Sequence, residues 1–88
     1  MKARSDELQI FVCVIECGSI SAAAEQVGQT PSAVSRTLSR LEAKLETTLI
    51  NRTTRRLQLT DEGELLLRQA RAILDSVHAA QEALKPHD

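Results

Sequence analysis

The chain has 88 residues, a formal net charge of −1, one Phe, no Tyr and no Trp. So short a chain forms one small domain, whose core is marginal unless a partner, a metal ion or disulfide bonds add stability. Its apolar residues are mostly aliphatic, which favours a compact helical domain. No apolar run approaches the roughly 20 residues that span a bilayer, and the N-terminus has no signal-peptide pattern, so we expect a cytoplasmic protein without a membrane partner.

Charge is distributed unevenly along the chain. Between Thr30 and Thr60 six basic side chains stand against two acidic ones, whereas the segments on either side are net acidic. The basic residues of this segment are Arg36, Arg40, Lys44, Arg52, Arg55 and Arg56. A locally basic segment in an otherwise acidic protein is typical of a surface that binds nucleic-acid phosphates.

A first helix is expected to begin at Ser5, a candidate N-cap, and to stop at Gly18. Its apolar residues recur at three- and four-residue spacing and are Leu8, Phe11, Val12 and Ile15. Cys13 and Cys17 lie in the same apolar pattern. A structural zinc site needs four ligands, and the two histidines stand apart in the sequence. We therefore interpret both cysteines as reduced, small apolar residues and expect no metal and no cofactor.

A second, short helix is expected between the N-cap Ser19 and Gly28. Its apolar face consists of Ile20, Ala23, Ala24 and Val27. The small side chains of this face let another helix approach closely, as the tight crossing of a helix-turn-helix requires. Thr30 and Pro31 then supply the N-cap and the first residue of a third helix.

The third helix has one apolar side and one polar, basic side. The residues expected to be buried are Val34, Leu38, Leu41 and Leu45. The residues on or near the opposite side are Ser32, Ser35, Arg36, Ser39 and Arg40. Arginine matches the two major-groove acceptors of guanine, and serine hydroxyls suit phosphates and base edges. This side is a candidate surface for double-stranded DNA, with Arg36 and Arg40 as its cations.

Two short β-prone runs, Leu49 to Asn51 and Leu57 to Leu59, predict a small hairpin. The segment between them carries Arg52, Arg55 and Arg56, so the tip of the hairpin is basic. Such a tip suits the backbone or a groove of DNA.

A long last helix is expected after the N-cap Thr60, without a proline until Pro86. Apolar residues follow the spacing of a coiled-coil seam and are Leu66, Ala70, Ile73, Val77, Ala80 and Leu84. A helix of about 25 residues is roughly 37 Å long, so the preceding helices can cover only its first turns. The simplest cover for the rest is a second copy of the chain, which predicts a homodimer.

The elements together predict a mainly α fold. Residues 1–60 comprise three helices, with the tight crossing of a helix-turn-helix, plus a small β-hairpin, and residues 61–88 form a long helix for dimerisation. A dimer with two-fold symmetry presents two third helices to one face of DNA, so the expected partner is an inverted repeat in double-stranded DNA.

The run from Gly18 to Gly63 closely resembles the N-terminal domain of LysR-type transcriptional regulators, and the resemblance covers essentially the whole chain. The matching residues are Phe11, Val14, Gly18, Ser19, Ala23, Ala24, Ser35, Arg36, Leu41, Glu42, Leu49, Arg52, Leu59, Thr60 and Gly63. The resemblance implies a winged helix-turn-helix over residues 1–60, in which the β-hairpin is the wing, and a linker helix for dimerisation over residues 61–88. It further implies a regulator that binds a specific DNA sequence as a homodimer, with the third helix in the major groove and the wing at the minor groove.

The resemblance also implies roles for individual side chains. The implied recognition-helix contacts are Thr30, Ser32, Ser35 and Arg36. Of these, Arg36 is expected to reach a base. Ser19 and Ser21, at the start of the second helix, are expected to touch the phosphate backbone.

In the wing, Arg55 matches the residue that enters the minor groove, and Arg56 is the competing candidate in the same loop. Arg52 matches a position that either contacts phosphate or braces the wing, and both interpretations stay open.

Three residues depart from the common pattern of the family. Pro31 replaces a glutamine that contacts DNA, which changes specificity. Glu46 replaces glycine, so we expect the backbone of this turn to differ from the left-handed form. Ile50 replaces phenylalanine, which changes packing only.

The family's regulators continue into a larger effector-binding domain that this chain lacks, so we expect a piece of a longer protein, for which higher oligomers stay open. The alternative function is a helical protein-interaction module, which would show no salt-dependent DNA binding. An enzyme is not expected, because the serines have no neighbouring histidine and no glycine loop could cradle a phosphate.

Overall fold

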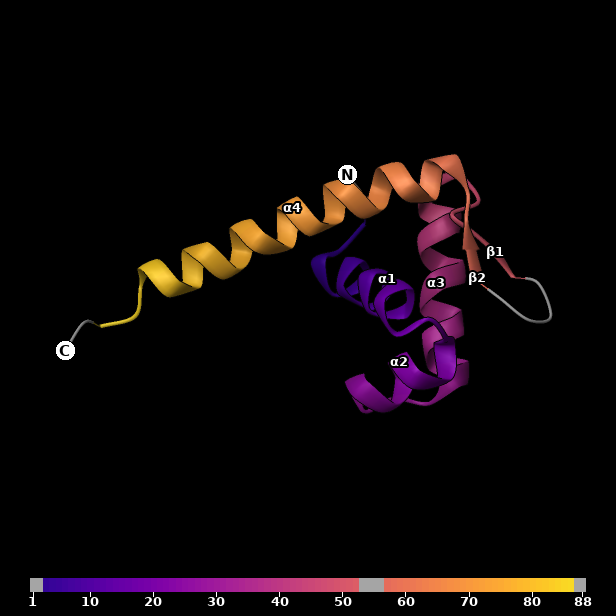
Figure 1. Cartoon of the computed structure of the whole chain (residues 1–88), viewed down its shortest axis with the longest axis horizontal. Coiled ribbons are helices and arrows are strands. Elements are labelled where there is room, and N and C mark those ends of the chain that lie inside the picture. Colours follow the sequence, from indigo (N-terminus) through magenta and orange to yellow (C-terminus); the bar gives the residue numbers. More distant parts are fainter. Residues whose placement is uncertain (1–2, 53–56, 87–88) are drawn as a thin grey trace.

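The computed structural model describes residues 3–52 and 57–86 and has four helices and two strands within these ranges (Figure 1). In chain order they are α1 (Ser5–Cys17), α2 (Ile20–Val27), α3 (Pro31–Leu45), β1 (Ile50–Arg52), β2 (Leu57–Leu59) and α4 (Asp61–Ala83). The predicted fold class, mainly α with a small hairpin and a long last helix, is confirmed.

The helices α1 to α3 and the hairpin together form a compact part, here called the head, from which α4 extends. Figure 1 shows α4 crossing over α1 and continuing away from the other helices, so that its last turn lies far from the hairpin. The helix α1 contacts α2, α3 and α4. The chain is therefore elongated, with principal extents of 51 × 26 × 18 Å.

One apolar core joins the helices of the head to β1 and α4. Its most deeply buried side chains are Leu8, Phe11, Val14, Ala23, Ala24, Val34, Leu38, Leu41, Leu49 and Ala70. The three- and four-residue spacing thus identified the inner sides of α1 and α3. Four residues of the expected apolar faces lie at the edge of this core, since Ile15, Ile20 and Leu45 are half-buried and Val27 is 38% exposed.

Three of the four expected N-caps are confirmed. The side-chain oxygens of Ser19, Thr30 and Thr60 each accept a hydrogen bond from the backbone N–H three residues later, at 3.0 to 3.1 Å. Each bond satisfies an N–H group that has no partner within its helix. These three residues therefore fix where α2, α3 and α4 begin.

The start of α1 differs from the prediction. The N-cap is Arg4, and Ser5 is the first helical residue, because the carboxylate of Glu7 accepts the backbone N–H of Arg4 at 2.8 Å. Glu7 is only 5% exposed and also accepts two hydrogen bonds from the ammonium group of Lys44, at 2.8 and 2.9 Å. The hydrogen bond from Lys44 holds the pKa of Glu7 below its usual value. This pair ties the first turn of α1 to α3.

The hairpin begins one residue later than predicted. Its antiparallel partners are Ile50 with Leu59, Asn51 with Gln58, and Arg52 with Leu57. Leu49 is excluded from the strand because its backbone groups bond elsewhere. Its N–H donates to the carboxylate of Glu42 at 2.8 Å, and its carbonyl accepts from the backbone N–H of Thr60 at 3.0 Å.

The turn after α3 contradicts the expectation drawn from Glu46. This residue is left-handed, with φ 53° and ψ 42°, so the form usual for glycine is kept without glycine. Two backbone hydrogen bonds close the end of the helix, from Glu46 to Ala43 at 3.3 Å and from Thr47 to Glu42 at 3.1 Å. These bonds outweigh the steric cost of a side chain in this conformation.

Replacing Glu46 with glycine is expected to raise the free energy of unfolding by about 1 kcal/mol, because glycine has no Cβ to clash in the left-handed form. Urea denaturation followed by circular dichroism measures the change. Glu46→Ala is the control, since it removes the same charge but keeps the Cβ, and it should gain little. Equal gains in both variants would assign the effect to the charge rather than to the backbone.

The fold divides the predicted α4 seam into two halves. Ala70 is fully buried against the head, and Leu66 and Ile73 are half-buried on the same core. The remaining seam residues are exposed and are Val77, Ala80 and Leu84. The chain itself therefore covers the first half of the seam and leaves the second half open. Across residues 3–52 and 57–86, no helix combines the length and apolar character needed to cross a membrane.

Candidate nucleic-acid interface

The outer side of α3 is polar, basic and open to solvent. Its exposed residues are Thr30, Ser32, Arg36, Ser39 and Arg40. Ser35 is half-buried at the edge of the same side. The structure thus brings the predicted recognition residues together on one helix, opposite the buried Val34, Leu38 and Leu41.

The two serines at the start of α2 differ in their surroundings. Ser19 uses its hydroxyl oxygen as the N-cap of the helix, accepting from the N–H of Ala22 at 3.1 Å. Ser21 is exposed. Because α2 packs directly on α3, both serines belong to the helix pair that carries the recognition residues.

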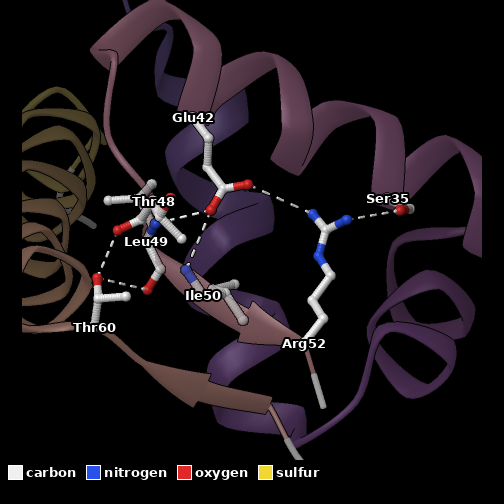
Figure 2. A network of polar contacts seen from close by, with 7 residues as sticks. All are labelled: Ser35, Glu42, Thr48, Leu49, Ile50, Arg52 and Thr60. Atoms are coloured by element: carbon white, nitrogen blue, oxygen red, sulfur yellow. Dashed lines mark hydrogen bonds and ion pairs between the residues drawn. The ribbon is translucent and has the colours of Figure 1, made fainter. Parts of the chain in front are cut away.

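A network of polar contacts connects α3 to the first strand of the wing (Figure 2). One carboxylate oxygen of Glu42 accepts the backbone N–H groups of Leu49 and Ile50, at 2.8 and 3.2 Å. The other lies 3.8 Å from Nη2 of Arg52. The Nη1 group of Arg52 donates to the hydroxyl of Ser35 at 3.4 Å. Of the two roles expected for Arg52, the structure therefore contains the contacts that brace the wing.

Glu42 is the residue of this site whose contacts the sequence did not reveal. It appeared only as one match in a family pattern, yet it makes three of the contacts drawn in Figure 2. The feature of the sequence that points to Glu42 is its negative charge, which stands within an otherwise basic segment of the chain.

The tip of the wing lies outside the described residues. This segment, residues 53–56, includes Arg55 and Arg56. Their expected contact with the minor groove stays a prediction.

The two cysteines are free, and their Sγ atoms lie 3.7 Å apart on α1. The thiol of Cys17 donates to the side-chain oxygen of Gln26 on α2 at 3.3 Å. Both cysteines pack against the core, and burial raises the pKa of the Cys13 thiol. In the part of the chain that the structure describes, no three His, Cys, Asp or Glu side chains meet as metal ligands. The packing of Cys13 and Cys17 against the core agrees with the interpretation of both as small apolar residues.

An apolar groove of about 370 Å³ lies between the end of α3 and the first half of α4. Its walls include Leu45, Leu49, Leu65, Leu66, Gln69 and Ile73. Leu65 is 52% exposed at this groove. The groove and the open half of the α4 seam are thus two apolar surfaces on one helix.

Residues 5–64 match the family model of the bacterial regulatory helix-turn-helix proteins, lysR family. The chain belongs to the LysR family. Over its whole length it is 52% identical to the LysR-family regulator CrgA of Neisseria meningitidis, described as an HTH-type transcriptional regulator, and covers 30% of that protein. The chain therefore spans less than a third of the length of this relative.

Two solved structures of LysR-type DNA-binding domains, each in a complex with DNA, have the same fold as this chain. The DNA-binding domain of CbnR with DNA has a TM-score of 0.86 and 30% identity, over 92% of this chain and 93% of that one. The DNA-binding domain of BenM with benA site 1 DNA has a TM-score of 0.88 and 27% identity, over 92% of this chain and 91% of that one. The resemblance to LysR-type regulators is confirmed.

Proposed function

We propose that this chain is the DNA-binding part of a homodimeric transcription regulator that recognises a specific sequence in double-stranded DNA. In this proposal α3 enters the major groove, the wing lies at the minor groove, and residues 61–88 pair two copies. The observation that carries the proposal is the exposed Ser and Arg side of α3, in a fold that CbnR and BenM use in complexes with DNA.

The proposed contacts divide by chemistry. Arg36 reads a base edge, and the serines and Thr30 position α3 through hydrogen bonds to phosphates and bases. Ser21 and the start of α2 contact the backbone. In the wing, Arg55 or Arg56 enters a narrow, A·T-rich minor groove, whose negative potential attracts arginine.

A second copy of the chain is the proposed occupant of the apolar groove. When two α4 helices pair antiparallel about a two-fold axis, the second half of one helix lies against the first half of the other. The exposed Val77 and Leu84 of one copy then meet the partner's apolar groove, and the symmetry makes the same contact twice. Dimerisation would thus cover both apolar surfaces that the head leaves open.

Selection of bound sequences from random duplex DNA tests the proposed function. The expected result is an inverted repeat, bound with an affinity that falls steeply as salt rises. Absence of salt-dependent DNA binding would favour the alternative, a protein-interaction module.

Arg36→Ala is expected to weaken binding to the selected sequence by about 1–3 kcal/mol and to relax discrimination at one base position, as for a bidentate contact to guanine. Fluorescence anisotropy with single-base variants of the site measures both effects. Arg68→Ala is the control, because it removes the same charge from an exposed position on α4. A loss of equal size on random DNA would show that Arg36 contacts phosphate only.

A further inference from the structure

The network around Glu42 places a fixed negative charge beside a cation at the edge of the recognition surface. We propose that Glu42 is a specificity-determining residue: it holds Arg52 on the protein and so prevents this cation from adding to sequence-independent binding of phosphates. The inference rests on the proposed function, since it concerns how the same surface distinguishes one DNA sequence from another.

Glu42 is held in place by backbone groups rather than by Arg52. One of its oxygens accepts two hydrogen bonds from the start of β1, at 2.8 and 3.2 Å, and its side chain is 21% exposed. Hydrogen bonds to an ionised carboxylate are among the stronger ones in proteins. The negative charge therefore stays where it is, whether or not Arg52 remains beside it.

Arg52 is held more loosely. Figure 2 shows its side chain reaching from β1 toward α3, with the guanidinium group between Glu42 and Ser35. Both contacts, 3.8 Å and 3.4 Å, are longer than a well-formed hydrogen bond. The attachment is therefore mainly the attraction between two opposite charges, which a DNA phosphate could replace.

The contact with Ser35 places the guanidinium group of Arg52 near the proposed DNA surface. Ser35 lies one residue before Arg36 on α3, and Arg52 is the last residue of β1 before the wing loop. Without Glu42, the guanidinium group would be free to bind any phosphate within reach. A phosphate contact of this kind carries no sequence information. On random DNA no base contact fixes the orientation of α3, so the released cation can turn to a phosphate more readily than in the specific complex. Non-specific binding then gains more than specific binding, which lowers the ratio of specific to non-specific affinity.

A double-mutant cycle on Glu42 and Arg52 tests the inference. The affinity of each chain for the selected site and for random duplex DNA is measured over a range of salt concentrations. Glu42→Gln is expected to bind random DNA about three- to tenfold more tightly, with a slope of log K against log salt steeper by about 0.9, as for one added phosphate contact. Arg52→Gln should leave the wild-type slope unchanged, and the double variant should return to it.

Glu46→Gln is the matched control, because it removes the same charge from an exposed position at the end of α3 without releasing Arg52. An equal change of slope in Glu46→Gln would overturn the inference and assign the effect to net charge. An unchanged slope in Glu42→Gln, with its helical circular dichroism retained, would overturn it as well.

Arg52→Gln tests the inference even if Glu42→Gln fails to fold, because this variant keeps Glu42 and its hydrogen bonds to the backbone. A slope lower by about 0.9 in this variant would show that Arg52 already contacts phosphate beside Glu42, contrary to the inference. Failure of the proposed function looks different: the wild-type chain itself would then show no salt-dependent DNA binding.

Discussion

Replacing Gly63 with alanine is expected to lower the free energy of unfolding by about 3 kcal/mol. A Cβ at this position in the first turn of α4 would collide with the backbone oxygen of Leu49 and lie 3.0 Å from a methyl group of Leu59. The oxygen cannot easily move, because it accepts from the N–H and the hydroxyl of Thr60, at 3.0 and 3.2 Å. Relief of the collision would separate α4 from the wing.

Thermal and urea denaturation measure this loss. Helix propensity alone predicts the opposite sign, since alanine in place of glycine inside a helix gains about 1 kcal/mol. Ser76→Ala is a suitable control, because it raises propensity at an exposed α4 position and should be neutral or slightly stabilising. A gain in stability for Gly63→Ala would show that the close approach to Leu49 is not maintained in solution.

Val77→Glu is expected to separate the proposed dimer into folded monomers. Val77 is 44% exposed in the single chain, so the head and α4 tolerate a charge there. In the dimer the same side chain would be buried, and an unpaired buried charge costs several kcal/mol. We expect a monomer at tens of micromolar by sedimentation, weak binding of a half-site, and an affinity for the inverted repeat lower by about a hundredfold or more.

Ala79→Glu is the matched control, since it adds the same charge to an exposed position on another side of α4. It should leave both the dimer and the affinity for the inverted repeat unchanged. A wild-type chain that is monomeric at these concentrations, or a Val77→Glu variant that binds the inverted repeat as well as wild type, would contradict the proposed seam.

Local signals in the sequence predicted most of the fold, because they act over a few residues. Ser19, Thr30 and Thr60 could be recognised as N-caps, since each precedes an apolar pattern of helical spacing. The failure at Ser5 has a physical reason: Arg4 takes the cap position through the carboxylate of Glu7, which is itself held by Lys44 from a distant helix. A contact between two residues so far apart in the sequence leaves no pattern in the residues around either of them.

The division of the seam also depends on distant contacts. Sequence spacing treats Ala70 and Val77 alike, because both fall on one stripe of the helix. Only the crossing of α4 over α1 buries the first and leaves the second open. In the same way, the residues of the recognition side could be assigned to α3 from sequence, whereas the attachment of Arg52 to Glu42 required the position of β1 beside that helix.

Because α4 is one continuous helix, it rigidly connects the head to the proposed dimer contact, and a tilt at one end moves the other end. Gly63 and Ala70 are buried in the head, whereas Val77 stands beyond it, about 21 Å along the axis from Gly63 at 1.5 Å per residue. A tilt of about 10° in each of the two paired α4 helices would displace each head by about 4 Å, close to the rise of one base pair in DNA. The crossing angle of the two helices would then select the half-site spacing, and a torque applied at the far end of α4 would change which spacing fits.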